Sequence, residues 1–435
     1  MNVFKICLPM MISSLSSHIM LVMDQLILSH YSIDAMTGAS SASAWCSTLQ
    51  CAAMSITGIA GAFAGNYNGA GKYELVSGPI WQMIWFSFTL FCISIPISKF
   101  GGAYCIPKNL QTDGIPFFQM IMFFTPISGI YYSLSAFFIA IGKGLLVTIA
   151  AIVANLVNAS VDLILVFGCF GIDRYTGSIG AAIGTVTALF VNVSLLFSFF
   201  LRKEMRDKYK TSICKLNIQK LKQYLRLSIV GGLGHIFELG AWSIVYYSLA
   251  TLGKEIALIQ SIAVSVNLLL AFAVSGLEKG VISITANLLG AKQKYKVISV
   301  LKTGIKIHVI LCSCLSFIFF FFPEFITDRF IKFEVSPETV ELALSVLKLV
   351  WVYFLFDGCC WVIAGIIEGG GDLNYSMVTI AIGLCSGVAT PVVILNYLGR
   401  LNIITTWILL ICTVITITTA LYRRYRSDKW IHIYA

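Results

Sequence analysis

The chain has 435 residues, of which 58% are hydrophobic and only 11% are charged. Soluble domains carry about 25% charged residues. The charged residues of this chain are too few to cover a water-facing surface, so a soluble globular protein is excluded. The 13 cysteines have neither zinc-site nor C-x-x-C spacing, and we interpret them as small hydrophobic side chains in a membrane protein.

Apolar runs recur along the chain, and at about 20 residues each is long enough to cross a bilayer as an α-helix. The first run is too long for a cleavable signal peptide and lacks a small-residue cleavage site, so we expect none. The composition predicts an all-α integral membrane protein with twelve transmembrane helices. In chain order the predicted spans are Ile6–Leu28, Ala42–Gly65, Pro79–Phe100, Phe117–Ile141, Leu145–Phe167, Ile179–Leu201, Leu227–Leu249, Ile256–Ala286, Ile305–Phe322, Leu342–Ile367, Met377–Leu398 and Ile403–Leu421.

The longest polar segment divides these spans into two groups of six. It covers residues 202–226 and contains nine lysines and arginines, and we interpret it as a solvated connector. The predicted organisation is a first six-helix lobe at 1–201, a cytoplasmic linker at 202–226, and a second six-helix lobe with a basic tail at 227–435.

Basic residues are distributed unequally between the two sides of the predicted bundle. Of the 30 lysines and arginines, 21 lie in segments on the side of the termini and seven in the opposite loops. The positive-inside rule therefore predicts that both termini and the linker are cytoplasmic. The net charge of +10 follows from this topology, so we expect no nucleic-acid partner.

A short glycine-rich sequence occurs once in each half. The second span is followed by GNYNGAGKYELV, Gly65–Val76, and the eighth by ANLLGAKQKYKVI, Ala286–Ile298. Asn66 matches Asn287 at a distance of 221 residues, and a Gly-Ala pair follows each three residues later. The glycine and hydroxyl residue that a P-loop requires are missing. Because six spans is an even number, the sequence predicts a parallel repeat with one cytoplasmic turn used twice.

Twelve spans in two halves with this turn resemble the multidrug and toxic compound extrusion (MATE) transporters. A second match is VANLVNASVDLILVFGCFGIDRYTGSIGAAIGTVTA, Val153–Ala188, and a third is Pro9 with Asp24 fifteen residues later. The resemblance covers essentially the whole chain and implies the fold and function of that family. The chain resembles a divergent member, because asparagine replaces the usual glutamine before the glycine turn and Glu368 stands near the position of a usual arginine.

Two acids of the first half are predicted at a similar depth in the membrane. Asp24 lies about 18 residues into its span and Asp162 about 17 into its span, and both spans start on the cytoplasmic side. Asn158 shares a helical face with Asp162. These oxygen atoms could bind a proton or Na⁺, because two close carboxylates resist double ionisation. The resemblance adds Thr185 to this site. The alternative is that the acids reach the outer headgroups and Asn158 is a packing amide.

Further candidates lie in the second half and in the first span. Glu238 and Asp357 are predicted near the middle of spans seven and ten, and they match acids that some family members use. They could form a cation or substrate site, or only a buried structural hydrogen bond. The resemblance implies that Pro9 bends the first span during coupling, and the alternative is a proline tolerated in a first helical turn. We assign no role to His18 or His235.

The resemblance implies a secondary active antiporter that exports organic, cationic solutes, including multiple drugs, in exchange for H⁺ or Na⁺. We expect no cofactor beyond the coupling ion, no metal other than Na⁺ at the cation site, and a monomer in the bilayer of a bacterial inner membrane. A lipid or lipid-linked oligosaccharide flippase is the alternative, but it would need a strongly cationic cavity. An intramembrane enzyme is less consistent with the sequence, which lacks H-E-x-x-H and other catalytic motifs.

Overall fold

The computed structural model describes residues 3–168, 177–321 and 336–432. The predicted end of the ninth span at Phe322 lies outside these ranges. So do three of the seven basic residues predicted in the loops opposite the termini, namely Arg174, Arg329 and Lys332. The helices are α1 (Val3–Tyr31), α2 (Ile33–Gly69), η1 (Tyr73–Leu75), α3 (Ser77–Thr89), α4 (Phe91–Phe100), α5 (Gly102–Cys105), η2 (Lys108–Leu110), α6 (Gln111–Ala140), α7 (Gly144–Phe167), α8 (Gly177–Phe200), α9 (Lys203–Tyr209), α10 (Ile218–Ala250), α11 (Lys254–Gly290), η4 (Lys294–Lys296), α12 (Val297–Phe321), α14 (Pro337–Gly369), α15 (Leu373–Leu384), η5 (Cys385–Ala389), α16 (Thr390–Tyr397) and α17 (Ile403–Arg426).

Twelve helical stretches in the described ranges are long and apolar enough to span a membrane, which confirms the predicted fold class. Several helices extend beyond their apolar runs. For example, α2 begins at Ile33, nine residues before the predicted Ala42, because Ser32 caps it by accepting from the Asp34 backbone N–H at 3.2 Å. Caps and small residues extend a helix where the hydropathy has already fallen, so the apolar run marks only its central part.

The eleventh span is not a regular helix. It consists of α15, the π-helical η5 and α16. Pro391 lies in the first turn of α16 and has no N–H to donate to the carbonyl of Gly387 within η5. A widened π turn at this point accommodates the proline without ending the helix.

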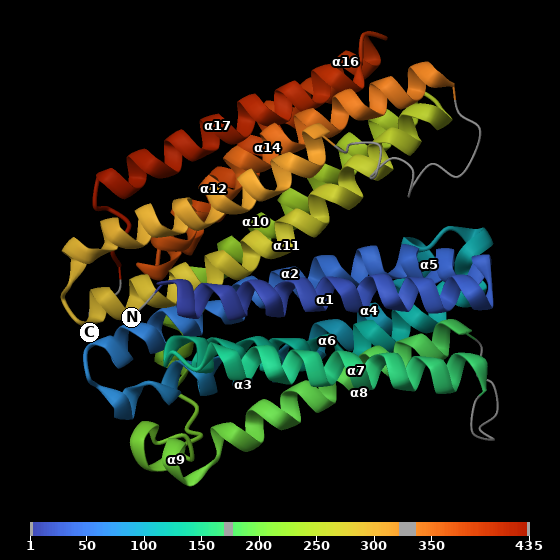
Figure 1. The fold of residues 1–435 in the computed structure, drawn as a ribbon. Coiled ribbons are helices and arrows are strands. Elements are labelled where there is room, and N and C mark those ends of the chain that lie inside the picture. The colour runs from blue at the N-terminus through green and yellow to red at the C-terminus, as the bar shows by residue number, and fades with distance from the viewer. Residues whose placement is uncertain (1–2, 169–176, 322–335, 433–435) are drawn as a thin grey trace.

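The helices form two bundles (Figure 1). One contains α1 to α8 and the other α10 to α17, and the bundles meet at the end with both termini and diverge toward the opposite end. Across the interface α1 packs on α11, and α2 packs on both α10 and α11. Helices α1 and α2 are the first two spans of the first half, and α10 and α11 are the first two of the second half. The contact of α1 with α11 is therefore the symmetry partner of the contact of α10 with α2. This arrangement is that of a parallel two-fold repeat.

The two repeated glycine turns meet at the end where the bundles are closed. A Cβ atom on Gly69 would overlap the carbonyl of Asn287, and one on Gly290 would overlap the carbonyl of Asn66. The Asn68 side chain donates to Asn287 Oδ1 at 2.7 Å across the same contact. The glycines therefore permit backbone-to-backbone approach of α2 and α11, and the repeated residues lie on one face of the protein.

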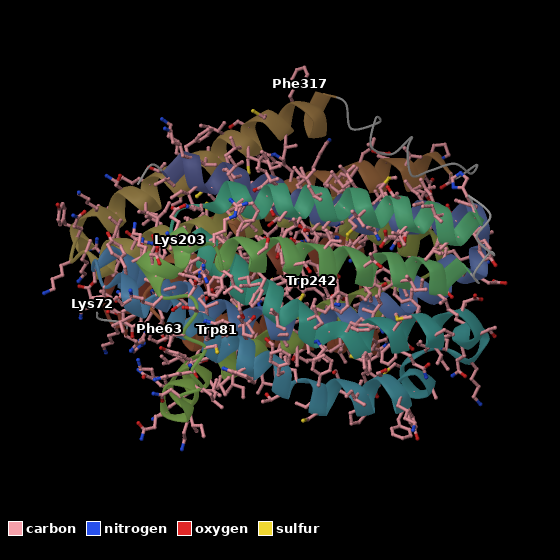
Figure 2. All side chains as sticks on the ribbon, turned by 90° about the horizontal axis from the view of Figure 1, so that it is seen from below. Phe63, Lys72, Trp81, Lys203, Trp242 and Phe317 are labelled. Atoms are coloured by element: carbon pink, nitrogen blue, oxygen red, sulfur yellow. The ribbon has the colours of Figure 1, made fainter. Side chains whose placement is uncertain are left out.

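The linker differs from a solvated connector. Side chains of α3 donate to its backbone carbonyls: Trp81 to Thr211 at 2.9 Å and Gln82 to Lys215 at 2.8 Å. Trp81 and Lys203 lie near the same end of the molecule in Figure 2. Asn217 caps α10, so the last nine residues of the predicted linker are helical. An extended backbone needs hydrogen-bond partners, and α3 supplies them.

Candidate functional site

Three helices of the first bundle bring together the four residues predicted for the first-lobe site. Asp24 is on α1, Asn158 and Asp162 are on α7, and Thr185 is on α8. Helix α7 packs against both α1 and α8. Asp24 is 7% exposed, while Asn158 and Asp162 are fully buried. Buried acids need partners within the protein, and both side chains have little or no exposed surface, so the headgroup alternative does not describe them.

Hydrogen bonds connect the members of this site. Thr185 Oγ1 donates to Asp24 Oδ2 at 3.2 Å. With its amide oriented to satisfy both ends, Asn158 donates to Asp24 Oδ1 at 2.8 Å and accepts from the Thr185 backbone N–H at 3.2 Å. In this orientation the amide oxygen, which accepts from Thr185, also lies 3.3 Å from Asp162 Oδ2. Asn158 therefore lies between the two carboxyl groups and is more than a packing residue.

The site is suited to a small cation or a proton. Asn158 brings the carboxyl groups of Asp24 and Asp162 close together, and two carboxylates offer only acceptors, so a direct bond between them requires a proton on one of them. Asp162 Oδ1 is buried and has no hydrogen-bond partner among the described residues. An acceptor in this position can receive a proton or contact a cation that enters the site.

Gly184 is a site residue that the sequence analysis did not identify. A Cβ atom at this position of α8 would overlap the carboxyl group of Asp162. The glycine therefore makes the space in which the acid lies at the α7–α8 contact. The sequence places Gly184 next to Thr185 in GAAIGTVTA. Several glycines and alanines of this stretch could equally serve helix packing, so the sequence did not single out Gly184.

Pro9 lies inside α1, which begins at Val3, so it does not occupy the first turn. It cannot donate to the preceding turn, and one backbone hydrogen bond of α1 is missing there. Its carbonyl accepts from Thr148 Oγ1 of α7 at 2.7 Å. This contact joins the weakened turn of α1 to the helix that carries Asp162.

Glu238 and Asp357 lie on α10 and α14 of the second bundle, within electrostatic range of each other. Asp357 is 8% exposed and accepts from the Tyr353 hydroxyl at 3.2 Å. Glu238 Oε2 is 3.0 Å from His235 Nδ1. The sequence analysis gave His235 no role, although its spacing of three residues from Glu238 places both on one helical face.

An aromatic cluster adjoins Asp357. The rings of Trp242, Tyr353 and Trp407 lie with centroids 5.9 to 6.4 Å apart, and Trp242 is near the middle of the molecule in Figure 2. Aromatic faces next to carboxylates provide two kinds of attraction for an organic cation, through the ring quadrupole and through charge.

Two more acids lie toward the closed end of the second bundle, Glu278 partly buried and Glu368 buried. Glu278 of α11 is within electrostatic range of Glu368 and His235. Glu368 is 7% exposed and accepts from Ser376 Oγ at 3.0 Å. The interior of this bundle therefore has more acids than the two candidates predicted from midplane position.

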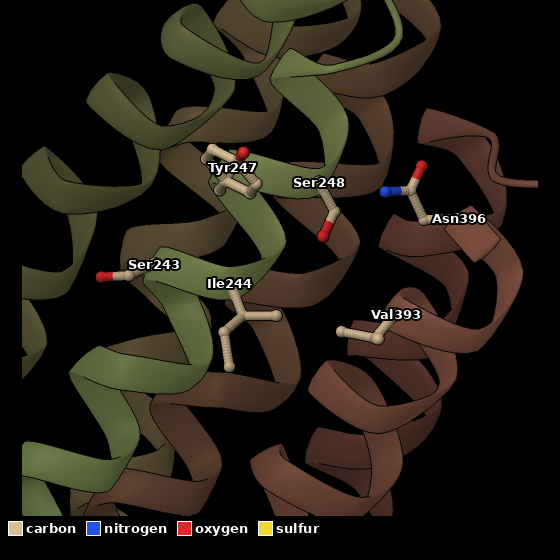
Figure 3. A pocket seen from close by; sticks show the side chains of 6 residues that line it. All are labelled: Ser243, Ile244, Tyr247, Ser248, Val393 and Asn396. Atoms are coloured by element: carbon tan, nitrogen blue, oxygen red, sulfur yellow. The ribbon is translucent and has the colours of Figure 1, made fainter.

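A pocket of about 420 Å³ opens between α10 and α16, and none of the predicted site residues lines it (Figure 3). Its lining includes Ser243, Ser248 and Asn396. The repeat offset of 221 residues relates Asp24 to Val245. Later in each half, Gly142 follows α6 and Gly371 follows α14, both with positive φ, and aligning these two glycines relates Asp162 to Pro391. The copy of the first-lobe site in the second bundle thus has no carboxylates, and the two halves differ in chemistry.

Comparison with known proteins identifies similar sequences and folds. The MatE family model matches residues 244–395. The probable multidrug resistance protein NorM of Photorhabdus laumondii is 22% identical over 50% of this chain, and the chain spans only 48% of its length. The probable multidrug resistance protein YoeA of Bacillus subtilis is 23% identical, over 79% of this chain and 75% of that protein. A solved outward-facing multidrug resistance MATE transporter is 14% identical, with a TM-score of 0.85 over 98% of this chain and 94% of that one.

Proposed function

We propose that the chain is a secondary active antiporter of the MATE type that exports organic cations in exchange for H⁺ or Na⁺; the match to the MatE family model and the similarity to multidrug resistance proteins support this. The observation that carries this proposal is the buried site of Asp24, Asn158, Asp162 and Thr185. Ionisable groups inside a membrane protein are costly, and two acids that share one hydrogen-bonded site can bind and release a coupling ion.

Coupling is proposed to begin on the side away from the termini, toward which the bundles diverge. An ion from that side binds between Asp24 and Asp162 and reduces the repulsion between the two carboxyl groups. The helices α1, α7 and α8 that carry the site then readjust around it. Pro9 lies on the same helix as Asp24, so a change at the site is transmitted along α1 to a turn with one hydrogen bond fewer.

The second bundle is proposed to hold the solute. Glu238 and Asp357 supply negative charge, and the partly exposed ring of Trp242 supplies a flat surface for a planar cation. An acidic interior favours this function over a flippase, because the headgroup of a lipid-linked sugar carries phosphates and needs cations around it.

Transport in proteoliposomes tests the proposal. We expect efflux of a fluorescent organic cation to be driven by a proton gradient alone or by a sodium gradient alone, with the effective gradient identifying the ion. Vesicles without protein and vesicles without a gradient are the controls. Equal efflux with and without both gradients would exclude an ion-coupled antiporter.

We further propose a monomer in a bacterial inner membrane with both termini cytoplasmic. The relatives named above are bacterial proteins, and Lys72 and Lys203 lie at the same end of the molecule as the termini. The exposed Lys215 of the linker reports the orientation. We expect an impermeant amine reagent to modify Lys215 in inverted vesicles and not in intact cells. Modification in intact cells would reverse the proposed topology.

A further inference from the structure

A groove with a volume of about 340 Å³ lies at the end of the molecule that carries both termini. It is formed by the first turns of α7, the end of α8 and the start of α9. One wall is polar and consists of Lys143, Arg202 and Glu204. The other wall is apolar and includes Leu145 and Ile149. A groove with these two walls fits a ligand that is charged at one end and apolar at the other.

The polar wall has a net positive charge. Lys143 Nζ is 3.0 Å from Glu204 Oε1, and both side chains are accessible to solvent. The Arg202 guanidinium lies 3.8 Å from the centre of the Phe199 ring. Stacking uses the face of the guanidinium, so its N–H edge can still donate to an acceptor. Two cations and one carboxylate on the wall favour an anion.

The apolar wall continues along the outside of α7. Leu145, Ile149 and Leu156 are 60%, 51% and 65% exposed, and their spacing of four and seven residues places them on one face of the helix. Because α7 is a membrane span, this face borders the acyl chains of the bilayer. The groove is therefore located where this lipid-facing stripe meets the basic residues at the membrane surface.

We propose that the groove binds one anionic phospholipid. Its phosphate contacts Lys143 and Arg202, and one acyl chain follows Leu145 and Ile149 along α7. Basic pockets between transmembrane helices are suited to such headgroups, because charge-assisted hydrogen bonds form beside an apolar surface. Glu204 competes with the phosphate for Lys143. This site is separate from both candidate transport sites and does not depend on the proposed antiport.

Native mass spectrometry of the full chain in detergent tests the proposal, with titration of phosphatidylglycerol, phosphatidylcholine and glycerol phosphate. We expect the parent protein to retain phosphatidylglycerol in preference to phosphatidylcholine. Lys143→Gln and Arg202→Gln are each expected to weaken this binding about fivefold, the effect of removing one surface cation. Glu204→Gln is expected to strengthen it, because it frees Lys143.

Lys208→Gln is the matched control. It removes the same charge from α9, but the Lys208 ammonium lies 4.5 Å from the Tyr73 ring centre and is not part of the groove. We expect parent affinity. Equal weakening by Lys208→Gln would indicate diffuse attraction, and displacement of the lipid by equimolar glycerol phosphate would indicate a simple anion site; either result overturns the proposal. If the Lys143 or Arg202 variant fails to fold, the Glu204→Gln variant tests the proposal alone. Unchanged or weaker binding of phosphatidylglycerol by that variant would contradict a competition between Glu204 and the lipid phosphate for Lys143.

Discussion

Replacement of Asp24 or Asp162 by asparagine is expected to reduce gradient-driven efflux to the rate measured without a gradient. Each substitution keeps the shape of the side chain and removes the ionisable group that a proton or Na⁺ would neutralise. Insertion into the membrane and binding of the solute should persist, because the proposed solute site lies in the other bundle. Efflux from proteoliposomes and equilibrium binding of the same fluorescent cation measure the two properties separately.

The two losses should also be non-additive, because both carboxyl groups contact Asn158 in one site and either substitution alone disables that site. Residues in one site couple by roughly 0.5–3 kcal/mol. The loss of efflux rate in the double variant should therefore be about twofold to 150-fold smaller than the product of the two single losses. Asp34→Asn, in the first turn of α2 outside the site, is the control and should transport at the parent rate. A double variant with parent-level coupled efflux would remove this site from the mechanism and leave Glu238 and Asp357 as the candidates.

Alanine at Gly69 or Gly290 is expected to impair both stability and transport. Either methyl group would overlap a backbone carbonyl of the opposite turn, so α2 and α11 must separate where the two bundles are in contact. Overpacking of a filled interface costs about 1–3 kcal/mol, and backbone atoms have less freedom to move than side chains. We expect a lower midpoint of thermal unfolding in detergent and slower efflux, because the conformation closed at this end is disfavoured.

Gly78→Ala is the control for this effect. Gly78 lies at the start of α3, soon after the first glycine turn, and a Cβ atom there would meet no atom within 4 Å. It should leave the midpoint unchanged or raise it slightly through the better helix propensity of alanine. The Gly69→Ala, Gly290→Ala double variant should be little worse than either single variant, since both disrupt one contact. If Gly69→Ala and Gly78→Ala have equal midpoints, the close approach of the turns is not important for stability.

The sequence by itself determined the membrane class, the twelve spans and the repeat. These properties depend on hydropathy and on residue order, which are local and need no knowledge of packing. It also determined that Asp24 and Asp162 have similar depths, because the rise per residue of a helix relates sequence position to height. Depth does not specify direction, so the sequence could not decide whether the two acids face each other or the headgroups.

Only the tertiary structure decided those directions, because they depend on which helices are neighbours and how each is rotated. It placed α7 between α1 and α8, which joined the acids through Asn158 and showed that Gly184 provides the space for Asp162. It also docked the linker on α3, where carbonyls of a polar segment found donors in Trp81 and Gln82. Such contacts join residues far apart in the chain, and hydropathy and charge patterns contain no signal for them.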